Sequence, residues 1–254
     1  MLSKHLTNVI QNLEKKKFRD KYNLFKIEGK KLVGELLGSN FKINTLIAYP
    51  EWFENHTQII PKCQVIEVDE REMKKLSNFK SLPEVIALAE PLPSTWQEEE
   101  IRDSLSVVLN GIQDPGNLGT ILRVCDWFGI RHLFCDTDCA HAFNPKCVQA
   151  SMGAIFRVNV SYLNLEEFLP RFVNQNFECY GTFLNGENIY TSSLQRTGFI
   201  VMGNEGKGIS PEIERFVTRK LTIPSFSVSE YSTESLNVGV ATGIILSEFK
   251  RKGA

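Results

Sequence analysis

The stretch NGIQDPGNLGTILR covers residues 110–123 and indicates the fold class of this 254-residue chain. It follows a strand-like run, Ser106–Leu109, and turns through Asp, Pro, Gly and Asn. It then opens a helix with apolar periodicity and one arginine. Polar side chains at the carboxyl end of a parallel strand are where open α/β sheets build their sites. The stretch therefore predicts an α/β protein with a site at this turn.

Two later segments have the same strand–loop–helix layout. They are GNEGKG at residues 203–208 and Ser235-Leu236-Asn237. The carboxyl ends of parallel strands meet at one edge of a sheet. We therefore expect the three turns to form a single site.

The elements around these turns alternate from Ser104 onward. Predicted strands are Val107–Asn110, His132–Cys135, Cys179–Phe183, Phe199–Met202 and Leu221–Ile223. Predicted helices are Asn117–Phe128, Pro145–Met152, Leu165–Asn174, Pro211–Arg215 and Ser235–Lys252. This pattern is typical of a parallel α/β sheet.

The first ninety residues also alternate, with shorter elements. Predicted helices are 3–15, Gly29–Leu37 and the segment to Leu76 that opens with Asp69 and Glu72 as a capping box. Predicted strands are Leu24–Ile27, Asn44–Tyr49, Gln64–Val68 and Val85–Ala89, which suit a small α/β sandwich. A Pro-rich and then acidic stretch follows. We predict a domain at 1–92, a linker at 93–103 and a second domain at 104–254.

Composition is that of a water-soluble globular protein, with 42% hydrophobic and 23% charged residues. The apolar run Val238–Leu246 is far too short to span a membrane. The amino terminus lacks the apolar core of a signal peptide. The expected location is the cytoplasm, without membrane attachment.

Charge is unevenly distributed along the chain. Residues 1–31 hold nine Lys and Arg against three Asp and Glu, although the net charge of the whole chain is −1. A charge run alone is ordinarily a solvated helix end, but Phe18 and Tyr22 lie between the cations, which favours contact with RNA. The predicted RNA-binding residues are Lys15, Lys16, Lys17, Arg19 and Lys30.

The sequence lacks the residue spacing of several common metal-binding and catalytic motifs. The six cysteines form no C-x-x-C pair, and His132, Cys135, Cys139 and His141 match no standard zinc pattern, so no metal site is predicted. Residues 203–208 lack the spacing of a phosphate-binding P-loop, and no dinucleotide fingerprint or G-x-S-x-G elbow is present. Nucleotide hydrolysis, hydride transfer and acyl transfer are therefore disfavoured.

The glycine-rich turn at 203–208 permits two interpretations. Glycines allow positive φ and a close backbone approach, so main-chain groups could bind an adenine edge. Alternatively, the glycines only make tight turns.

The turns described above resemble the sequence motifs of a known family. It resembles the SpoU (TrmH-type) RNA ribose methyltransferases of the SPOUT superfamily. The resemblance covers residues 104–252 through three motifs in order: DPGNLGTILR at 114–123, IVMGNEGKGIS at 200–210, and Ile223-Pro224 leading to ESLNVGVATG at 234–243. The segments 144–146 and 150–154 also match family positions. Residues 19–33 resemble a substrate-binding domain related to a ribosomal-protein RNA-binding fold.

The resemblance implies a deep trefoil knot in the carboxy-terminal sheet, a homodimer, and S-adenosyl-L-methionine bound largely by main-chain groups. The matching cofactor positions are Gly203, Ile223 and Leu236, with Thr182 beside the cofactor. The matching catalytic positions are Asn117, Arg123, Glu205, Ser235 and Asn237.

The chemistry of Arg123 can be argued separately. A ribose 2′-hydroxyl must lose its proton as it attacks the methyl group, but a guanidinium stays protonated in proteins. We favour a bidentate grip on a phosphate, with Asn117 orienting the arginine. A part in proton removal stays open as the family alternative.

One departure and two alternatives remain. The loop at 225–233 is longer than in the family and lacks its glycine, which bears on cofactor geometry and substrate choice. The predicted function is methylation of the ribose 2′-hydroxyl, with ribosomal RNA as substrate because a separate binding domain is present. The alternatives are a tRNA 2′-O-ribose methyltransferase and a catalytically silent RNA-binding ribosome-assembly factor.

Overall fold

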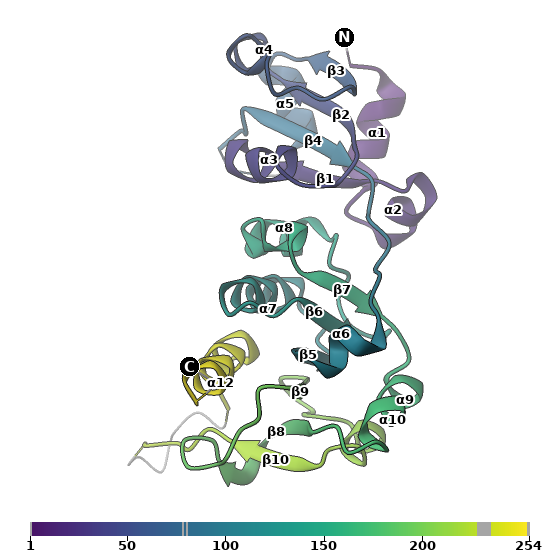
Figure 1. Ribbon diagram of the computed structural model, residues 1–254. Coiled ribbons are helices and arrows are strands. Elements are labelled where there is room, and N and C mark those ends of the chain that lie inside the picture. The colour runs from purple at the N-terminus through teal and green to yellow at the C-terminus, as the bar shows by residue number, and fades with distance from the viewer. Residues whose placement is uncertain (1, 78, 80, 228–234, 253–254) are drawn as a thin grey trace. The chain divides into compact units, whose positions relative to one another are not determined.

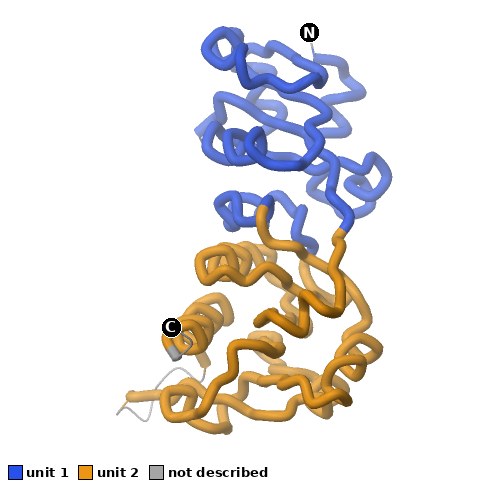
Figure 2. The backbone as a smooth tube through the Cα atoms, viewed as in Figure 1, with its two compact units in different colours: residues 1–93, 141–156 blue, residues 94–140, 157–254 orange. Residues whose placement is uncertain are grey.

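The computed structural model describes residues 2–77, 79, 81–227 and 235–252. The chain forms two compact units, residues 1–93 with 141–156 and residues 94–140 with 157–254 (Figure 2). None of the helices in this described part is both long and apolar enough to cross a membrane.

The first unit is built on a four-stranded sheet in the order β1-β4-β2-β3 (Figure 1). β4 pairs antiparallel with β1 and β2, and β2 pairs in parallel with β3. The strands are β1 (Phe25–Glu28), β2 (Ile43–Ala48), β3 (Gln64–Glu67) and β4 (Val85–Ala89). The amino-terminal helices are α1 (Lys4–Asn12), α2 (Lys16–Tyr22), α3 (Lys30–Leu37), α4 (Pro50–His56) and α5 (Glu70–Leu76).

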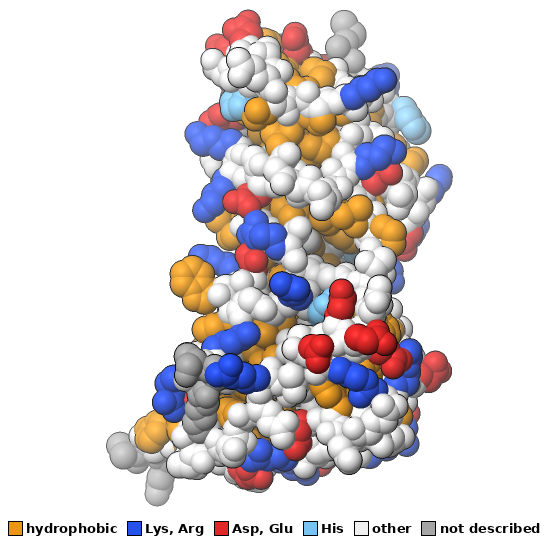
Figure 3. Space-filling model, viewed as in Figure 1, with side chains coloured by type: hydrophobic (Ala, Val, Ile, Leu, Met, Phe, Trp, Pro, Cys, Tyr) orange, Lys and Arg blue, Asp and Glu red, His pale blue; other side chains and the backbone are white. Residues whose placement is uncertain are grey.

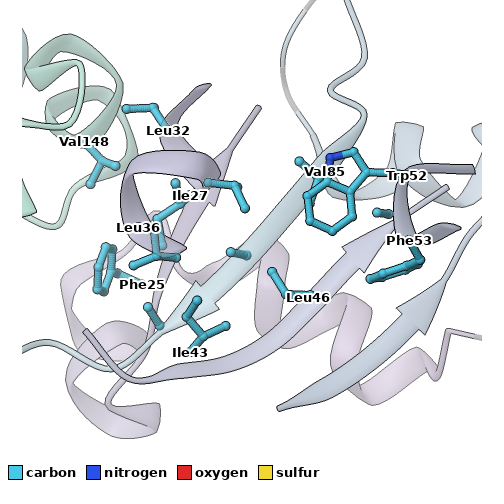
Figure 4. Packing of buried hydrophobic residues seen from close by; sticks show 14 residues of the cluster. Phe25, Ile27, Leu32, Leu36, Ile43, Leu46, Trp52, Phe53, Val85 and Val148 are labelled. Carbon is cyan, nitrogen blue, oxygen red and sulfur yellow. The ribbon is translucent and has the colours of Figure 1, made fainter. Parts of the chain in front are cut away.

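Strand β4 shows why helices cover both faces of this sheet. Its five residues are all buried, and successive side chains of a strand point to opposite faces. Val85, Ala87 and Ala89 join a cluster with residues of α3 and α4 (Figure 4). Ile86 and Leu88 join a second cluster with residues of α1 and α5. The predicted small α/β sandwich is confirmed.

The first unit also contains a segment from much later in the sequence. Helix α8 (Pro145–Ser151) and the short helix η1 (Ala154–Phe156) belong to it. The Phe143 ring lies 4.5 Å from that of Phe25, and Val148 enters the same hydrophobic cluster. Aromatic packing thus groups 141–156 with residues 1–93, whereas the sequence division places them in the domain 104–254. The first unit therefore consists of two separate segments of the chain, which a single boundary in the sequence cannot describe.

The second unit contains a six-stranded sheet in the order β10-β8-β9-β5-β6-β7, in which all five neighbouring strand pairs are parallel. Its strands are β5 (Leu105–Asn110), β6 (His132–Cys135), β7 (Asn159–Tyr162), β8 (Cys179–Asn188), β9 (Gly198–Gly203) and β10 (Arg219–Thr222). Its helices are α6 (Glu98–Arg102), α7 (Pro115–Trp127), α9 (Leu165–Phe168), α10 (Pro170–Val173), α11 (Pro211–Glu214) and α12 (Val238–Lys252). The predicted parallel α/β sheet is confirmed.

The strand order reverses in the middle of this sheet. The chain runs outward from β5 through β6 to β7 and then returns to the other side of β5. β5 and β9 are therefore neighbours from which the chain departs in opposite directions, a topological switch point where α/β proteins place their sites. All six residues of β5 are buried, as expected for a strand covered on both faces.

Local hydrogen bonds move several boundaries away from the sequence expectations. Helix α7 begins at Pro115 because the Asp114 side chain accepts the amide of Asn117 at 2.9 Å. Helix α12 begins at Val238 rather than Ser235, since the Asn237 side chain accepts the amide of Gly239 at 3.0 Å. Elements absent from the expectations are α2, α4, β7 and α6, the last inside the predicted linker.

The buried ion pair of the first unit generates a stability prediction. Lys26 Nζ lies 2.5 Å from Glu28 Oε1, with side chains 2% and 6% exposed, and also donates to the Leu76 carbonyl at 3.0 Å. Replacing Lys26 by Ala should lower the free energy of unfolding by about 3–5 kcal/mol, because it leaves an unpaired buried carboxylate. Urea denaturation of the whole chain measures this loss.

An exposed pair in the same unit provides the control. Lys30 and Glu84 lie 3.2 Å apart with side chains 74% and 54% exposed. Lys30→Ala should change the free energy of unfolding by no more than about 1 kcal/mol. Equal losses for the two variants would contradict the structural role assigned to Lys26.

Candidate active site

Asn117 joins the three motif segments of the second unit. It lies in the first turn of α7, and its Nδ2 donates to Glu205 Oε1 at 2.5 Å. Asn237 Nδ2 in turn donates to Asn117 Oδ1 at 2.9 Å. Asn117, Glu205 and Asn237, here called the amide–carboxylate cluster, therefore meet although they are far apart in sequence.

The loop after β9 is closed on itself, and this closure places Glu205. Asn204 and Gly208 exchange two backbone hydrogen bonds, of 2.9 and 2.8 Å. Asn204 Oδ1 accepts the amides of Gly206 and Lys207 at 3.0 and 3.1 Å. Glu205 thus sits in a tight turn that is closed by four hydrogen bonds.

Gly203 is required by this same turn. A Cβ built there would lie 2.3 Å from the carbonyl carbon of Gly208, a backbone atom that cannot yield. Gly208 itself has a φ of +72°, in the region that favours glycine. The tight-turn interpretation therefore holds for Gly203 and Gly208, and the loop backbone packs directly against the end of β9.

Two asparagines at the end of β5 and the start of the 203–208 loop fasten these segments together. Asn204 Nδ2 donates to the Gly111 carbonyl at 2.7 Å. The Ser210 amide donates to Asn110 Oδ1 at 2.7 Å, and Asn110 Nδ2 donates to Asp136 Oδ2 at 3.1 Å. Asn110 is only 6% exposed. Both ends of the Glu205 loop are thereby tied to β5. The predicted site residues do not include Asn110 or Asn204, although Asn110 ends the buried strand β5 and Asn204 directly follows the buried strand β9.

Other predicted catalytic residues are not tied to the cluster. Arg123 is exposed on α7, and its side chain makes no hydrogen bond or ion pair within the described residues. Ser235 is exposed and adjoins residues 228–234, which lie outside the described part of the chain. Of the predicted loop 225–233, only 225–227 are described.

The predicted cofactor positions lie on or directly after three strands and before the last helix. Thr182 is held within β8 by donating its hydroxyl to the Val201 carbonyl of β9 at 3.1 Å. Gly203 ends β9, and Ile223 follows β10 and is half-buried. Leu236 precedes α12 and is 47% exposed.

The histidines and cysteines considered for a metal serve other purposes. His132 and Cys135 are buried in β6, where burial lowers the pKa of His132. The Cys139 thiol donates to the Leu109 carbonyl at 3.3 Å, and a hydrogen bond with Cys135 lowers its pKa. Over residues 2–77, 79, 81–227 and 235–252, no three His, Cys, Asp or Glu side chains are grouped to hold a metal ion.

The predicted RNA-binding cations lie in the first unit and differ in exposure. Lys15, Lys16 and Lys17 are exposed at the start of α2, and Lys17 Nζ lies 5.3 Å from the Phe18 ring centre. Phe18 stacks on Tyr22 with ring centres 6.4 Å apart. This basic aromatic surface has the composition that suits nucleic acid.

Arg19 does not belong to that surface. It is 3% exposed, and its Nη1 donates to the carbonyls of Leu13 and Glu14 at 2.8 and 2.7 Å. The guanidinium instead closes the turn between α1 and α2. Lys30 is exposed but pairs with Glu84. The RNA-binding prediction for Arg19 therefore needs correction, because its charge is used inside the unit.

Charge in the second unit includes an acidic area. In the view of Figure 3, Asp and Glu side chains gather over α6, whose first turn consists of Glu98, Glu99 and Glu100. Carboxylates near a helix amino terminus are stabilised by its dipole, and they repel phosphate. Contact with nucleic acid is therefore not expected at α6.

The fold and site define an α/β protein with polar residues gathered at the switch point of a parallel sheet. The family model of the SpoU rRNA Methylase family matches residues 104–247, and that of the MRM3-like substrate binding domain matches residues 8–87. This chain belongs to the SpoU rRNA methylase family. Its second unit has the α/β fold of the SPOUT methyltransferases.

Individual relatives match over nearly the whole chain. A solved TrmH-family protein of Porphyromonas gingivalis is 38% identical, with a TM-score of 0.86 over 99% of both chains. An rRNA methyltransferase of Sinorhizobium meliloti, solved with AdoMet bound, is 28% identical, with a TM-score of 0.85 over 99% of this chain and 96% of that one. The 23S rRNA (guanosine(2553)-2′-O)-methyltransferase RlmP of Bacillus subtilis is 29% identical over 93% of this chain and 92% of its own length.

The hydrogen bond from the Ser210 amide to Asn110 Oδ1, here called the Asn110 clamp, generates a prediction about local opening of the 203–210 segment. Asn110→Ala should leave the Ser210 amide without its acceptor and speed its hydrogen exchange about 5- to 150-fold, the factor for a loss of about 1–3 kcal/mol. Amide exchange followed by NMR measures this. Thr120→Ala removes an exposed hydroxyl that donates to Gly116, and should leave the Ser210 amide unchanged. Similar exchange in both variants would disprove the clamp.

Proposed function

We propose that this SpoU-family protein transfers a methyl group from S-adenosyl-L-methionine to a ribose 2′-hydroxyl of RNA, and that its substrate is ribosomal RNA. The observation that carries the proposal is the amide–carboxylate cluster, since it unites residues of all three motifs at one edge of the sheet. Arg123 lies on the same helix as Asn117. The proposed catalytic residues are Asn117, Arg123, Glu205, Ser235 and Asn237.

The chemistry of Thr182, Gly203, Ile223 and Leu236 fits such a cofactor. Leu236 stands largely exposed and can cover an apolar purine face, while Ile223 is half-buried at the end of β10. Gly203 lets the backbone of Gly208 pack directly against the end of β9, which fixes the loop that would border the cofactor. Thr182, tied to β9, would form one wall. When bound, S-adenosylmethionine supplies an electrophilic methyl group on a positively charged sulfur.

The protein's own residues would orient the acceptor ribose. The Arg123 guanidinium stays protonated, so it suits bidentate binding of a phosphate better than removal of a proton. Asn117 is fixed between Glu205 and Asn237, so its amide has a defined direction. The Glu205 carboxylate provides a hydrogen-bond acceptor at the same place. Positioning of this kind lowers the barrier by removing the entropy cost of alignment.

Ribosomal RNA is favoured over tRNA by the extent of the matches. The relative from Bacillus subtilis, named as a 23S rRNA enzyme, aligns over 93% of this chain. The tRNA (guanosine(18)-2′-O)-methyltransferase of Aquifex aeolicus aligns over only 61%. The first unit, which matches the MRM3-like substrate binding domain, therefore points to the ribosomal substrate. The exposed cations Lys15, Lys16 and Lys17 of that unit would bind phosphates. We place the enzyme in the cytoplasm, where ribosomal RNA is found.

A homodimer is also proposed, through a groove between α7 and α12. The groove has a volume of about 560 Å³, and the two helices pack against each other (Figure 1). Val240 is 53% exposed and Tyr190 39% exposed there. Burying these apolar side chains against a second copy would stabilise the association. The lining residues are Thr120, Val124, Tyr190, Gly239, Val240, Gly243, Ile244, Ser247 and Glu248.

The catalytic proposal predicts a large loss on removing the guanidinium. Arg123→Ala should reduce kcat/KM for methyl transfer to rRNA about 100-fold or more, because the nucleotide loses its anchor. Arg123→Lys should recover only part, since an ammonium cannot bind in a bidentate way. Transfer of labelled methyl to rRNA, followed by mapping of alkali-resistant linkages, measures both rate and position.

Arg215 offers a matched control. Its exposed side chain pairs with Glu166, away from the cluster. Arg215→Ala should retain the wild-type rate. Label appearing on bases or on protein would rule out ribose methylation, and an unchanged rate in Arg123→Ala would remove that residue from the site.

RNA binding through the first unit should depend on salt. Replacing Lys15, Lys16 and Lys17 by Glu should weaken rRNA binding and flatten its dependence on salt concentration, because fewer counterions are released. Filter binding at several salt concentrations measures the slope. The same exchange at the exposed Lys62, Lys74 and Lys75 serves as the control. Identical slopes for the two triple variants would show that the basic aromatic surface of α2 does not bind RNA.

Dimer formation should depend on the groove. Val240→Glu places a charge on its apolar surface and should shift the protein toward the monomer, as measured by sedimentation velocity. Ile59→Glu, at a residue 53% exposed in the first unit, should leave the sedimentation coefficient unchanged. A monomeric wild-type protein would end the homodimer proposal.

A further inference from the structure

Cys135 and Cys139 form a pair of thiols in contact at the carboxyl end of β6. Cys135 ends the strand, and Cys139 lies in the turn 136–140 that follows it. The turn is closed by the Cys139 amide, which donates to the Asp136 carbonyl at 3.0 Å. The two side chains hydrogen-bond each other, and both thiols are free. The proposed roles in cofactor binding, catalysis and RNA binding use neither of them.

The turn that carries Cys139 is bonded to the end of β5. The Cys139 thiol donates to the Leu109 carbonyl at 3.3 Å. The Asp136 amide donates to the same carbonyl at 2.9 Å, and the Asp136 carboxylate accepts Asn110 Nδ2 at 3.1 Å. Asn110 in turn holds the Ser210 amide. The thiol pair is therefore connected through Asp136 to the Asn110 clamp.

Cys139 differs from other cysteines of the chain in its readiness to ionise. Hydrogen bonding with Cys135 lowers the pKa of Cys139. Backbone hydrogen bonds from Ile112 and Gly111 also lower this pKa, whereas burial and the charge of Asp136 raise it. Burial instead raises the pKa of three other cysteines, which are Cys63, Cys125 and Cys179. Because the thiolate is the nucleophile, Cys139 is the cysteine best prepared to react with an oxidant.

Access also favours Cys139 as the first thiol to react. Cys139 is 9% exposed and Cys135 is fully buried. Thr137 and Asp138 are exposed, so the turn 136–140 lies at the surface. Hydrogen peroxide is small enough to reach a thiol that borders such a turn. Cys135 needs no access of its own, because it already contacts the Cys139 side chain.

We propose that Cys135 and Cys139 are a redox site, at which hydrogen peroxide converts the two thiols to a disulfide that loosens the bonding of the turn 136–140 to β5. The Cys139 thiolate attacks one peroxide oxygen, the O–O bond breaks, and the departing hydroxide takes up the thiol proton to give water. Cys135 then attacks the sulfur of the resulting sulfenic acid, the S–O bond breaks, and a second water leaves with the Cys135 proton. The peroxide is reduced and the two thiols are oxidised.

The disulfide changes the contacts at the end of β5. A disulfide sulfur carries no hydrogen, so oxidation removes the bond from Cys139 to the Leu109 carbonyl. The two sulfurs also approach to about 2 Å, which is closer than any hydrogen bond. The turn therefore tightens and shifts Asp136, whose carboxylate bonds Asn110. The Asn110 clamp should loosen, and methyl transfer should slow; only this last consequence rests on the proposed function.

Peptide mapping tests the disulfide directly. Trypsin cleaves after Arg131 and Lys146, so one peptide, residues 132–146, contains Cys135 and Cys139 and no other cysteine. The folded full-length protein is treated with hydrogen peroxide, its free thiols are alkylated, and it is digested. Mass spectrometry should find this peptide without alkyl groups and lighter by two hydrogen atoms. Treatment with dithiothreitol before alkylation should restore both thiols.

The other cysteines and one variant provide the controls. Cys63 is half-buried and thus more exposed than Cys139, but its pKa is raised, so it should remain alkylated. Cys135→Ser removes the second thiol, and peroxide should then leave Cys139 as a sulfenic or sulfinic acid. Two alkylated thiols in the oxidised wild-type peptide overturn the proposal. A disulfide to a different cysteine, or sulfinic acid at Cys139 in place of the disulfide, also overturns it.

Amide exchange measures the effect on the Asn110 clamp. The Ser210 amide of the oxidised wild type should exchange about 5-fold faster or more than that of the reduced protein. In Cys139→Ser, whose hydroxyl can still donate to the Leu109 carbonyl, peroxide should leave this rate unchanged. A disulfide without faster exchange overturns the loosening of the turn 136–140.

Methyl transfer separates this inference from the function on which its last consequence rests. Oxidation should slow transfer to rRNA by the wild type, and dithiothreitol should restore the rate. An unchanged rate in the fully oxidised protein overturns control of the reaction by this site. A reduced wild type that neither binds S-adenosylmethionine nor methylates rRNA refutes the proposed function, whereas peptide mapping and amide exchange still decide the thiol pair.

Discussion

The attachment of the 203–208 loop to the end of β5 is the constraint on which the site depends. Asn204 bonds the Gly111 carbonyl, and Asn110 accepts the Ser210 amide, so the loop is held at both ends. Neither bond involves a charged group, and the near-complete burial of Asn110 shields its side chain from water. Without them the Glu205 turn could move relative to α7, and the cluster around Asn117 would lose its geometry.

That attachment explains why the site occurs at this position in the sheet. β5 and β9 are hydrogen-bonded along their length, from Leu105 opposite Gly198 to Asn110 opposite Gly203. The chain continues from the two strands toward opposite edges of the sheet, so their carboxyl ends form a topological switch point. Asn117 follows β5 and Glu205 follows β9, and the two side chains bond each other there. A small polar cluster at this place costs little stability, because the pairing of β5 with β9 already fixes the positions of the two loops that carry it.

The residues around this frame divide into fixed and free groups. Asn117 bonds both Glu205 and Asn237, whereas Arg123 and Leu236 have exposed side chains. Fixed groups suit orientation of a reacting hydroxyl, and exposed cationic or apolar groups suit capture of a ligand. The chain thus combines a hydrogen-bonded centre with exposed side chains around it, as the proposed function requires. The basic aromatic surface of α2 in the first unit is likewise formed by exposed side chains, among them Lys15, Lys16 and Lys17.

Sequence alone determined the α/β class, the capping box at Asp69, most of the strands and the three motif turns, because these follow from local periodicity and turn chemistry. It did not reveal β7 or α2, whose apolar patterns are short, nor that residues 141–156 pack with the first unit. Only the tertiary structure separated Arg19, buried against carbonyls, from the exposed Lys15–Lys17, since identical charges in a run carry no sign of which face they occupy. Likewise, only the tertiary structure assigned the clamp to Asn110 and Asn204, because hydrogen bonds between strands distant in sequence arise from the order of the sheet and leave no local pattern.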